Sequence, residues 1–376
     1  MSGACDRCLR RTDLIAAVAG SIDVAWREKR GRTARVLALP DAALLGLDPA
    51  AAARFERFDA AAARGRIAAA GLTAVCRCQR AYPERLRELP DPPAVLHVAG
   101  SLAAVRPGEA VAIVGARRAT PYGLELSRSL GHGIAAAGLP VISGMALGID
   151  SATHAGALEA LSPTAPPISA HGGALDAPPA AGRPVAVLAG GAETAYPARM
   201  RSLHARLIGA GAVVSEMPPG FTGHRWCFPA RNRIIAALST VTIVVEAATR
   251  SGSLITADLA TDLGRVVAAV PGPVTSRYSA GANELLHAGA AVIRGTRDVL
   301  DLVLGADAPP LPEPAPLVAL DPVQRRMLDA IERGQGTLAE LARTMEEAQA
   351  ASRTLSELEL LGLVRRGFGG RYVRCS

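Results

Sequence analysis

The 376-residue sequence is poor in lysine and in aromatic residues: Lys29 is its only lysine, and aromatic side chains make up 3% of the chain. No uninterrupted apolar run approaches the roughly 20 residues that span a bilayer. The first residues contain no apolar signal-peptide segment. We therefore expect a cytoplasmic protein with no membrane segment. The length is too great for one compact core and predicts two or three domains.

Common nucleotide-binding and catalytic motifs are also absent. The loop after the strand predicted at 111–114 reads Gly115-Ala-Arg117 rather than Gly-x-Gly-x-x-Gly. The next predicted strand ends in Ser143, where a ribose-binding carboxylate belongs, which counts against NAD. A P-loop needs a lysine that the chain lacks there, and neither a Cys–His pair nor a Gly-x-Ser-x-Gly motif is found. We therefore predict a binding protein, not an enzyme, with no cofactor and no metal in its functional site.

The formal net charge of +7 favours an anionic partner. Because arginine is frequent throughout the chain, the positions of the arginines are more informative than their number. The cysteines leave two interpretations open. Cys5-x-x-Cys8 and Cys76-x-Cys78 could supply four thiolates to one zinc ion, although the second spacing is tighter than usual. The alternative is scattered thiols in a helical domain.

The pattern of apolar segments predicts three domains. Residues 1–81 are alanine-rich and helical (SAM-like). Residues 82–304 alternate short apolar runs with helical patterns, which predicts an α/β domain with an extended Rossmann-like, doubly wound parallel sheet. Its strands are expected at 95–98 (an edge strand), 111–114, 139–143, 185–188, 213–215, 241–245, 266–270 and 291–293. A surface insertion is expected at 159–184. Residues 305–316 form a proline-rich linker, and residues 317–376 resemble a winged helix.

Ligands of an open α/β sheet bind at the carboxyl ends of its strands. In this sequence the strand ends and loop-to-helix turns are rich in glycine, serine and arginine, which predicts an anion-binding rim. Asp150 is expected to cap the helix that follows it. The residues predicted to form the rim are Gly115, Arg117, Ser143, Gly144, Gly190, Gly191, Arg231, Asn232, Arg233, Ser251, Gly252 and Ser253.

One segment combines aromatic rings with arginines. Trp226 and Phe228 lie beside Arg231 and Arg233, although aromatics are scarce elsewhere. Bases of single-stranded nucleic acid stack on such rings at about 1–3 kcal/mol each, while arginines bind the phosphates. We therefore predict that Trp226 stacks a base and that Arg117, Arg231 and Arg233 bind phosphates. Phe228 could instead close the core beneath the following helix.

The sequence resembles the DNA-processing protein A family (DprA, also called Smf). The resemblance covers about residues 82–304, in family order. Its motifs include Ser143-Gly-Met-Ala-Leu-Gly-Ile-Asp, Ser215-Glu-Met-Pro, Phe228-Pro-Ala-Arg-Asn-Arg-Ile-Ile and Ser251-Gly-Ser-Leu-Ile-Thr-Ala. It implies a cytoplasmic, non-enzymatic, homodimeric protein that binds single-stranded DNA independently of sequence. Such proteins protect incoming DNA in natural transformation and load the RecA recombinase onto it.

Two other functions fit parts of the sequence. An enzyme similar to the lysine-decarboxylase-like phosphoribohydrolases would carry Pro-Gly-Gly-x-Gly-Thr-x-x-Glu, whereas this chain has Arg250-Ser-Gly-Ser-Leu-Ile-Thr256-Ala-Asp and lacks the glutamate. A DNA-bound regulator acting through the winged helix would bind duplex DNA tightly with residues 317–376. Winged helices also serve as protein-contact modules, so both uses of this domain stay open.

Overall fold

The computed structural model describes residues 3–29, 36–105, 108–161, 182–305, 320–342, 344–360, 363–366 and 370–374. The chain divides into two compact units, Met1–Pro310 and Leu311–Ser376. Most of the predicted insertion and most of the predicted linker lie outside the described residues. In the described part of the chain, no helix combines the length and the apolar character that crossing a membrane requires.

Within the described residues, nine strands of the first unit form one sheet in the order β1-β2-β6-β5-β4-β3-β7-β8-β9. Neighbouring strands from β6 to β9 are parallel, and β1 and β2 are antiparallel additions. The strands are β1 (Thr73–Cys76), β2 (Val95–Gly100), β3 (Val111–Val114), β4 (Val141–Ser143), β5 (Pro184–Val187), β6 (Ala212–Ser215), β7 (Val241–Val244), β8 (Val266–Ala269) and β9 (Ala291–Val292).

This sheet confirms the predicted α/β fold, and the order is doubly wound because the chain moves outward from β3 in one direction and from β7 in the other. One strand prediction was wrong. β2 is not at the edge, since it pairs with β6 on one side and with β1 on the other. The strand at this edge of the sheet is β1, which sequence patterning missed.

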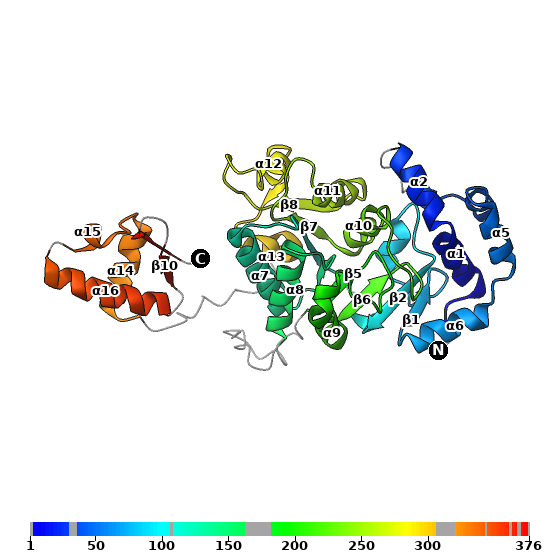
Figure 1. Ribbon diagram of the computed structural model, residues 1–376, viewed down its shortest axis with the longest axis horizontal. Helices are drawn as coiled ribbons and strands as arrows, with labels where there is room; N and C mark the ends of the chain where they lie inside the picture. Colours follow the sequence, from blue (N-terminus) through cyan, green and yellow to red (C-terminus); the bar gives the residue numbers. More distant parts are fainter. Residues whose placement is uncertain are drawn as a thin grey trace. The chain divides into compact units, whose positions relative to one another are not determined.

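Helices cover both faces of the sheet. Side chains alternate between the faces along each strand, so Val185 and Val187 pack in one core and Ala186 in the other. Figure 1 shows α10, α11 and α12 on one side of the strands and α7, α8 and α9 on the other. These helices and the last one of the unit are α7 (Pro121–Ala136), α8 (Ile149–Ala160), α9 (Arg201–Ala210), α10 (Cys227–Leu238), α11 (Gly252–Asp262), α12 (Ala280–His287) and α13 (Thr296–Leu304). Short 3₁₀ segments span Glu84–Glu88, Leu102–Val105 and Ala198–Met200.

The N-terminal helices belong to the same compact unit as the sheet. They are α1 (Asp6–Ala17), α2 (Ala19–Lys29), α4 (Asp41–Leu45), α5 (Pro49–Glu56) and α6 (Ala60–Ala69). Leu14 and Ile22 share a buried core with Trp226 and Ala230 of the sheet domain. Because β1 is itself a strand of the large sheet, the predicted division at residues 81 and 82 does not coincide with a gap in the packing.

The second unit contains α14 (Pro322–Glu332), α15 (Leu338–Leu341) and α16 (Met345–Leu360), followed by an antiparallel pair of β10 (Val364–Arg366) and β11 (Tyr372–Arg374). Its own core includes Leu328, Ile331, Leu355 and Tyr372. Asp321 and Gln324 form a reciprocal capping box at the start of α14. In the described residues of this unit, three helices precede a pair of antiparallel strands, and the winged-helix assignment stays a prediction.

Candidate functional site

A pocket of about 310 Å³ opens beside the carboxyl ends of β3 and β4, near the point where the strand order reverses. Such a switch point is where ligands of doubly wound sheets bind, because the loops on its two sides diverge and leave a crevice. Most of the predicted rim residues line this pocket together with Phe228; these rim residues are Gly115, Arg117, Arg231, Asn232, Ser251, Gly252 and Ser253. The remaining predicted residues lie elsewhere.

Arg117 supplies an exposed positive charge at the pocket. It stands in the loop between β3 and α7, and its guanidinium carbon lies 5.4 Å from the centroid of the Phe228 ring. At this separation the ring face attracts the cation and helps to orient it. A planar guanidinium such as this one can bind phosphate oxygens through paired N–H groups.

Arg231 lies deeper in the same pocket and connects three elements. Its Nη1 donates to the Gly144 carbonyl at 2.6 Å and to the Val187 carbonyl at 2.5 Å, and its Nε donates to Asn232 Oδ1 at 2.9 Å. Burial lowers the pKa of Arg231, the Asp150 carboxylate raises it, and the charge of Arg117 lowers it again. The two arginines therefore repel one another, and a bound anion would relieve this repulsion.

Asp150 balances part of that positive charge. Its Oδ2 accepts from the backbone amides of Gly144 and Ala146 at 3.1 and 3.3 Å, so it organises the loop before α8. The predicted helix cap is corrected, because Gly148 occupies the N-cap position and Asp150 lies in the first turn. Burial raises the pKa of Asp150, and Arg231 opposes this change.

Ser143 and Gly144 belong to the frame of the site rather than to its ligand surface, which corrects their predicted role. Ser143 is fully buried and its hydroxyl donates to the Ile113 carbonyl at 2.6 Å, joining β4 to β3. A Cβ on Gly144 would lie 2.0 Å from Arg231 Nη1. Glycine is thus required at 144 because the guanidinium occupies the space of a side chain.

The N-terminus of α11 contributes backbone amides and hydroxyls. Ser251 is its N-cap residue, and its Oγ accepts from the Ser253 amide at 3.4 Å and lies 2.7 Å from Ser253 Oγ. Asn232 holds this turn by donating from Nδ2 to the Gly252 carbonyl at 3.2 Å. The start of a helix favours negative charge because its first N–H groups and its dipole point outward.

The aromatic surface beside the pocket is formed by Phe228 and Tyr196. Their ring centroids are 5.6 Å apart, Phe228 is half-buried, and Tyr196 is 59% exposed. Phe228 also packs against the core shared with the N-terminal helices, which agrees with the alternative that it closes the core, whereas its contact with DNA stays a prediction. Tyr196 was not among the predicted site residues. Its position shortly after the strand-end glycines 190 and 191 was the available signal.

Trp226 does not lie on this surface, which corrects its predicted role in base stacking. The residue is 0% exposed, and its Nε1 donates to the Ala19 carbonyl at 2.9 Å. The surrounding core includes Leu14, Val18 and Ile22. A large ring with one polar atom is buried here because that atom finds a backbone acceptor.

Arg233 also differs from its predicted role as a phosphate ligand. Its Nε donates to Asp91 Oδ2 at 3.0 Å and its Nη2 to Glu216 Oε2 at 2.6 Å, and its side chain is only 4% exposed. Burial raises the pKa values of both carboxyl groups, and the Arg233 charge counteracts this effect. One cation between two anions has no surplus positive charge to offer a phosphate.

Gly190 and Gly191 do not line the pocket either. The Gly191 amide donates to the Phe221 carbonyl at 3.0 Å, so this N–H already has a partner within the protein. The turn connects the end of β5 to the loop that contains Phe221. Its role is structural, which corrects the predicted contact with DNA at Gly191.

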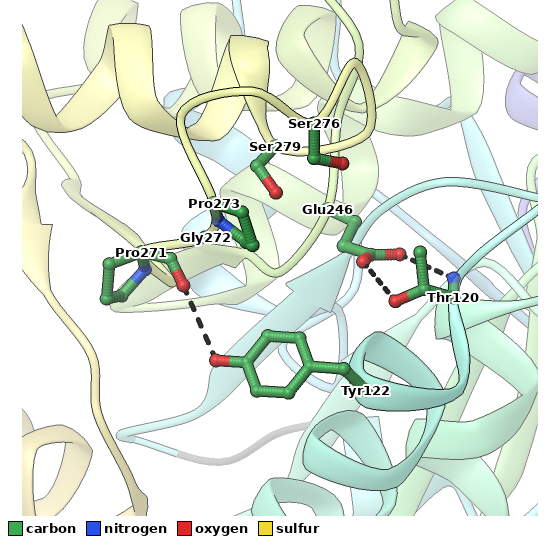
Figure 2. A pocket seen from close by; sticks show the side chains of 8 residues that line it. All are labelled: Thr120, Tyr122, Glu246, Pro271, Gly272, Pro273, Ser276 and Ser279. Carbon is green, nitrogen blue, oxygen red and sulfur yellow. Dashed lines mark hydrogen bonds between the residues drawn. The ribbon is translucent and has the colours of Figure 1, made fainter. Parts of the chain in front are cut away.

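A second pocket of about 420 Å³ is lined by residues that follow β3, β7 and β8 (Figure 2). Glu246, which follows β7, accepts from the Thr120 amide at 2.9 Å and from the Thr120 hydroxyl at 2.6 Å. Across the pocket, the Tyr122 hydroxyl donates to the Pro271 carbonyl at 3.4 Å. The carboxylate and the hydroxyls give this pocket a character opposite to that of the arginine-lined pocket.

The fold and the site define a doubly wound α/β protein whose switch point carries arginines, helix-start amides and an aromatic surface. Residues 73–304 match the DNA recombination-mediator protein A family, and the chain belongs to this family. A relative from Mycobacterium tuberculosis is 40% identical over 237 residues, which are 62% of this chain and 56% of the relative. The DNA processing protein DprA of Bacillus subtilis is 34% identical over 231 residues, which are 61% of this chain and 71% of that protein.

Two solved structures of this family also match. DNA processing protein A (DprA) from Streptococcus pneumoniae has a TM-score of 0.60 and 27% identity, with 79% of this chain and 96% of that chain covered. DNA processing protein A from Helicobacter pylori, whose structure concerns its single-stranded DNA binding mode, has a TM-score of 0.52 and 26% identity. That match covers 62% of this chain and 95% of the other. The chain matches little more than half the length of the M. tuberculosis relative.

Proposed function

We propose that this chain binds single-stranded DNA, independently of sequence, at the pocket formed by Arg117, Arg231 and the start of α11. One observation carries the proposal. The exposed Arg117 guanidinium lies near the Phe228 ring, and both residues line the pocket that also contains Arg231. Phosphates would bind at the arginines and the helix-start amides, and bases would stack on Tyr196 and Phe228. The single-stranded DNA binding mode of the H. pylori family member supports this assignment.

The exposed side chain of Arg117 makes it the most direct test of this function. Replacing Arg117 with alanine removes one phosphate contact, so the salt dependence of binding to an oligothymidylate should flatten by roughly 0.7 in log–log slope. Arg118 is the matched control, because it is the next residue, is also exposed and does not line the pocket. Equal effects of Arg117→Ala and Arg118→Ala on affinity and slope would contradict the assignment.

The stacking surface is tested at Tyr196. Tyr196→Ala should weaken binding about 5- to 150-fold, the equivalent of 1–3 kcal/mol for one stacked base. Tyr196→Phe keeps the ring and should leave the affinity close to that of the native protein. If the phenylalanine variant binds as weakly as the alanine variant, the ring does not stack a base.

We infer further that the protein protects incoming DNA and loads the RecA recombinase onto it during natural transformation or recombination. It would act in the cytoplasm as a homodimer and without catalysing a reaction. A family of DNA recombination mediators supports a recombinase as the partner. His154 in α8 is buried, and burial lowers its pKa to about 3. The imidazole is therefore neutral near pH 7, which favours binding over acid–base chemistry there. Faster RecA assembly on single-stranded DNA that carries a single-strand-binding protein is the expected result. An unchanged assembly rate would contradict it.

We also propose that the C-terminal unit is a winged helix. Its three helices and its hairpin support this topology. Comparing duplex binding by the full chain and by residues 1–310 separates the two uses of such a module. Loss of duplex affinity in the shorter chain would favour DNA contact, and an unchanged affinity would favour protein contact.

A further inference from the structure

Four cysteine side chains meet at the junction between the N-terminal helices and the sheet. Cys5 and Cys8 come from the beginning of α1, and Cys76 and Cys78 come from the end of β1 and the turn after it. Although the two pairs are about 70 residues apart in the sequence, all four Sγ atoms lie within 4.8 Å of one another. Cys8 and Cys76 are buried, whereas Cys78 is exposed.

The spacing of the sulfur atoms suits one tetrahedral metal ion. With a Zn–S distance of about 2.3 Å, the edge of a tetrahedral site is about 3.8 Å long. The Cys8 and Cys78 Sγ atoms are 3.7 Å apart, and no separation exceeds the ideal edge by more than about 1 Å. Because the separations are this close to the ideal edge, small side-chain rotations would complete the tetrahedron.

Two hydrogen-bond donors lie beside the sulfurs. The Cys5 amide donates to Cys76 Sγ at 3.5 Å, and the Arg7 guanidinium donates to Cys78 Sγ at 3.7 Å. Four thiolates around Zn²⁺ carry two excess negative charges, which a neighbouring guanidinium and the N-terminal end of α1 both stabilise. The turn that presents Cys76 and Cys78 is held by the Cys76 amide, which donates to Gln79 Oε1 at 2.8 Å.

We propose that Cys5, Cys8, Cys76 and Cys78 bind one structural zinc ion. Four protein ligands close the coordination sphere, so the ion would stabilise the fold rather than activate a substrate. It would fasten α1 to the edge strand β1. Since α1 and α2 cover Trp226 at the start of α10, the ion also supports the helix that carries Arg231.

Metal analysis of the full chain tests this proposal. Protein purified without chelator should contain about one zinc ion per chain by mass spectrometry. Replacement by Co²⁺ should give the visible d–d bands and the thiolate charge-transfer bands of a tetrahedral sulfur site. A zinc content near zero, iron in place of zinc, or an intact mass that shows disulfides among the four cysteines would overturn it.

Two cysteine variants test whether zinc depends on the four-cysteine cluster rather than on cysteines elsewhere in the chain. Cys78→Ser removes an exposed ligand and should lower both the zinc content and the melting temperature. Cys227→Ala is the matched control, because Cys227 is a buried cysteine outside the cluster and its loss should leave the zinc content unchanged. Cys78→Ser protein that keeps its full zinc content, or a zinc content that falls equally in both variants, would contradict the assignment. If Cys78→Ser fails to fold, the zinc content and the cobalt spectrum of the native chain still decide the question.

Discussion

Replacing Arg233 with alanine should lower the stability of the folded protein without removing a DNA contact. The substitution leaves Asp91 and Glu216 without their shared cation in a buried site, where both carboxylates are within hydrogen-bond distance of Arg233. Breaking a buried ion pair in this way costs about 3–5 kcal/mol. For the N-terminal unit, Met1–Pro310, an unfolding entropy of about 2 cal/mol/K per residue converts this cost into a fall of roughly 6 °C in melting temperature.

The loss should depend on pH. Burial raises the pKa values of Asp91 and Glu216, and removing the Arg233 charge raises them further. A carboxyl group whose pKa is higher in the folded than in the unfolded state is stabilised by protonation at low pH, and this stability is lost as the pH rises through the folded value. The difference in melting temperature between native protein and Arg233→Ala should therefore be smaller at acidic than at alkaline pH.

The assay is differential scanning fluorimetry at acidic, neutral and alkaline pH. Binding of single-stranded DNA is measured beside it, at a temperature where both proteins are folded. Adding Asp91→Asn and Glu216→Gln to Arg233→Met should recover part of the stability, because no buried charge then lacks a partner. Arg117→Ala should behave in the opposite manner, with weaker binding and an unchanged melting temperature. An Arg233→Ala protein that melts like the native one but binds DNA less tightly would refute the reasoning and restore Arg233 as a phosphate ligand.

Other substitutions distinguish frame residues from ligand residues. Trp226→Phe should lower stability by about 1–3 kcal/mol in thermal unfolding, because it removes the bond to the Ala19 carbonyl and leaves a void, while the folded fraction keeps its DNA affinity. A loss of affinity without a loss of stability would contradict this. Gly144→Ala should reduce both stability and binding, since the new Cβ displaces the Arg231 guanidinium. Native stability together with native affinity in this variant would show that the Arg231 contacts are dispensable.

The sequence predicts much of the sheet because its strands are short apolar runs bounded by glycine or by helical segments. β1 escaped prediction because Thr73-Ala-Val-Cys76 is short, follows an alanine-rich helix and has only two buried side chains. Whether β2 lies at an edge depends on its partner across the sheet, which no local pattern specifies. The glycine, serine and arginine residues at the strand ends predict the rim, and the structure brings most of the predicted residues to one pocket.

The predictions that were wrong concern which residues of a motif are buried. Arg231 and Arg233 are two positions apart on α10, so their side chains leave the helix about 200° apart. One therefore reaches the pocket, while the other reaches Asp91 and Glu216. The sequence analysis chose Trp226 as the stacking ring and did not consider Tyr196. The packing of the N-terminal helices, which covers Trp226 and leaves Tyr196 exposed, has no local signal in the sequence.

The two pockets carry opposite charges, so the rim is positive on one side and negative on the other. The loop after β3 runs between them: Gly115 and Arg117 face one pocket, while Thr120 holds the Glu246 carboxylate beside the other. A polyanion approaching this rim meets attraction on the arginine side and repulsion on the glutamate side. Under the proposed function, a DNA backbone would therefore follow the Arg117 pocket and avoid the Glu246 pocket.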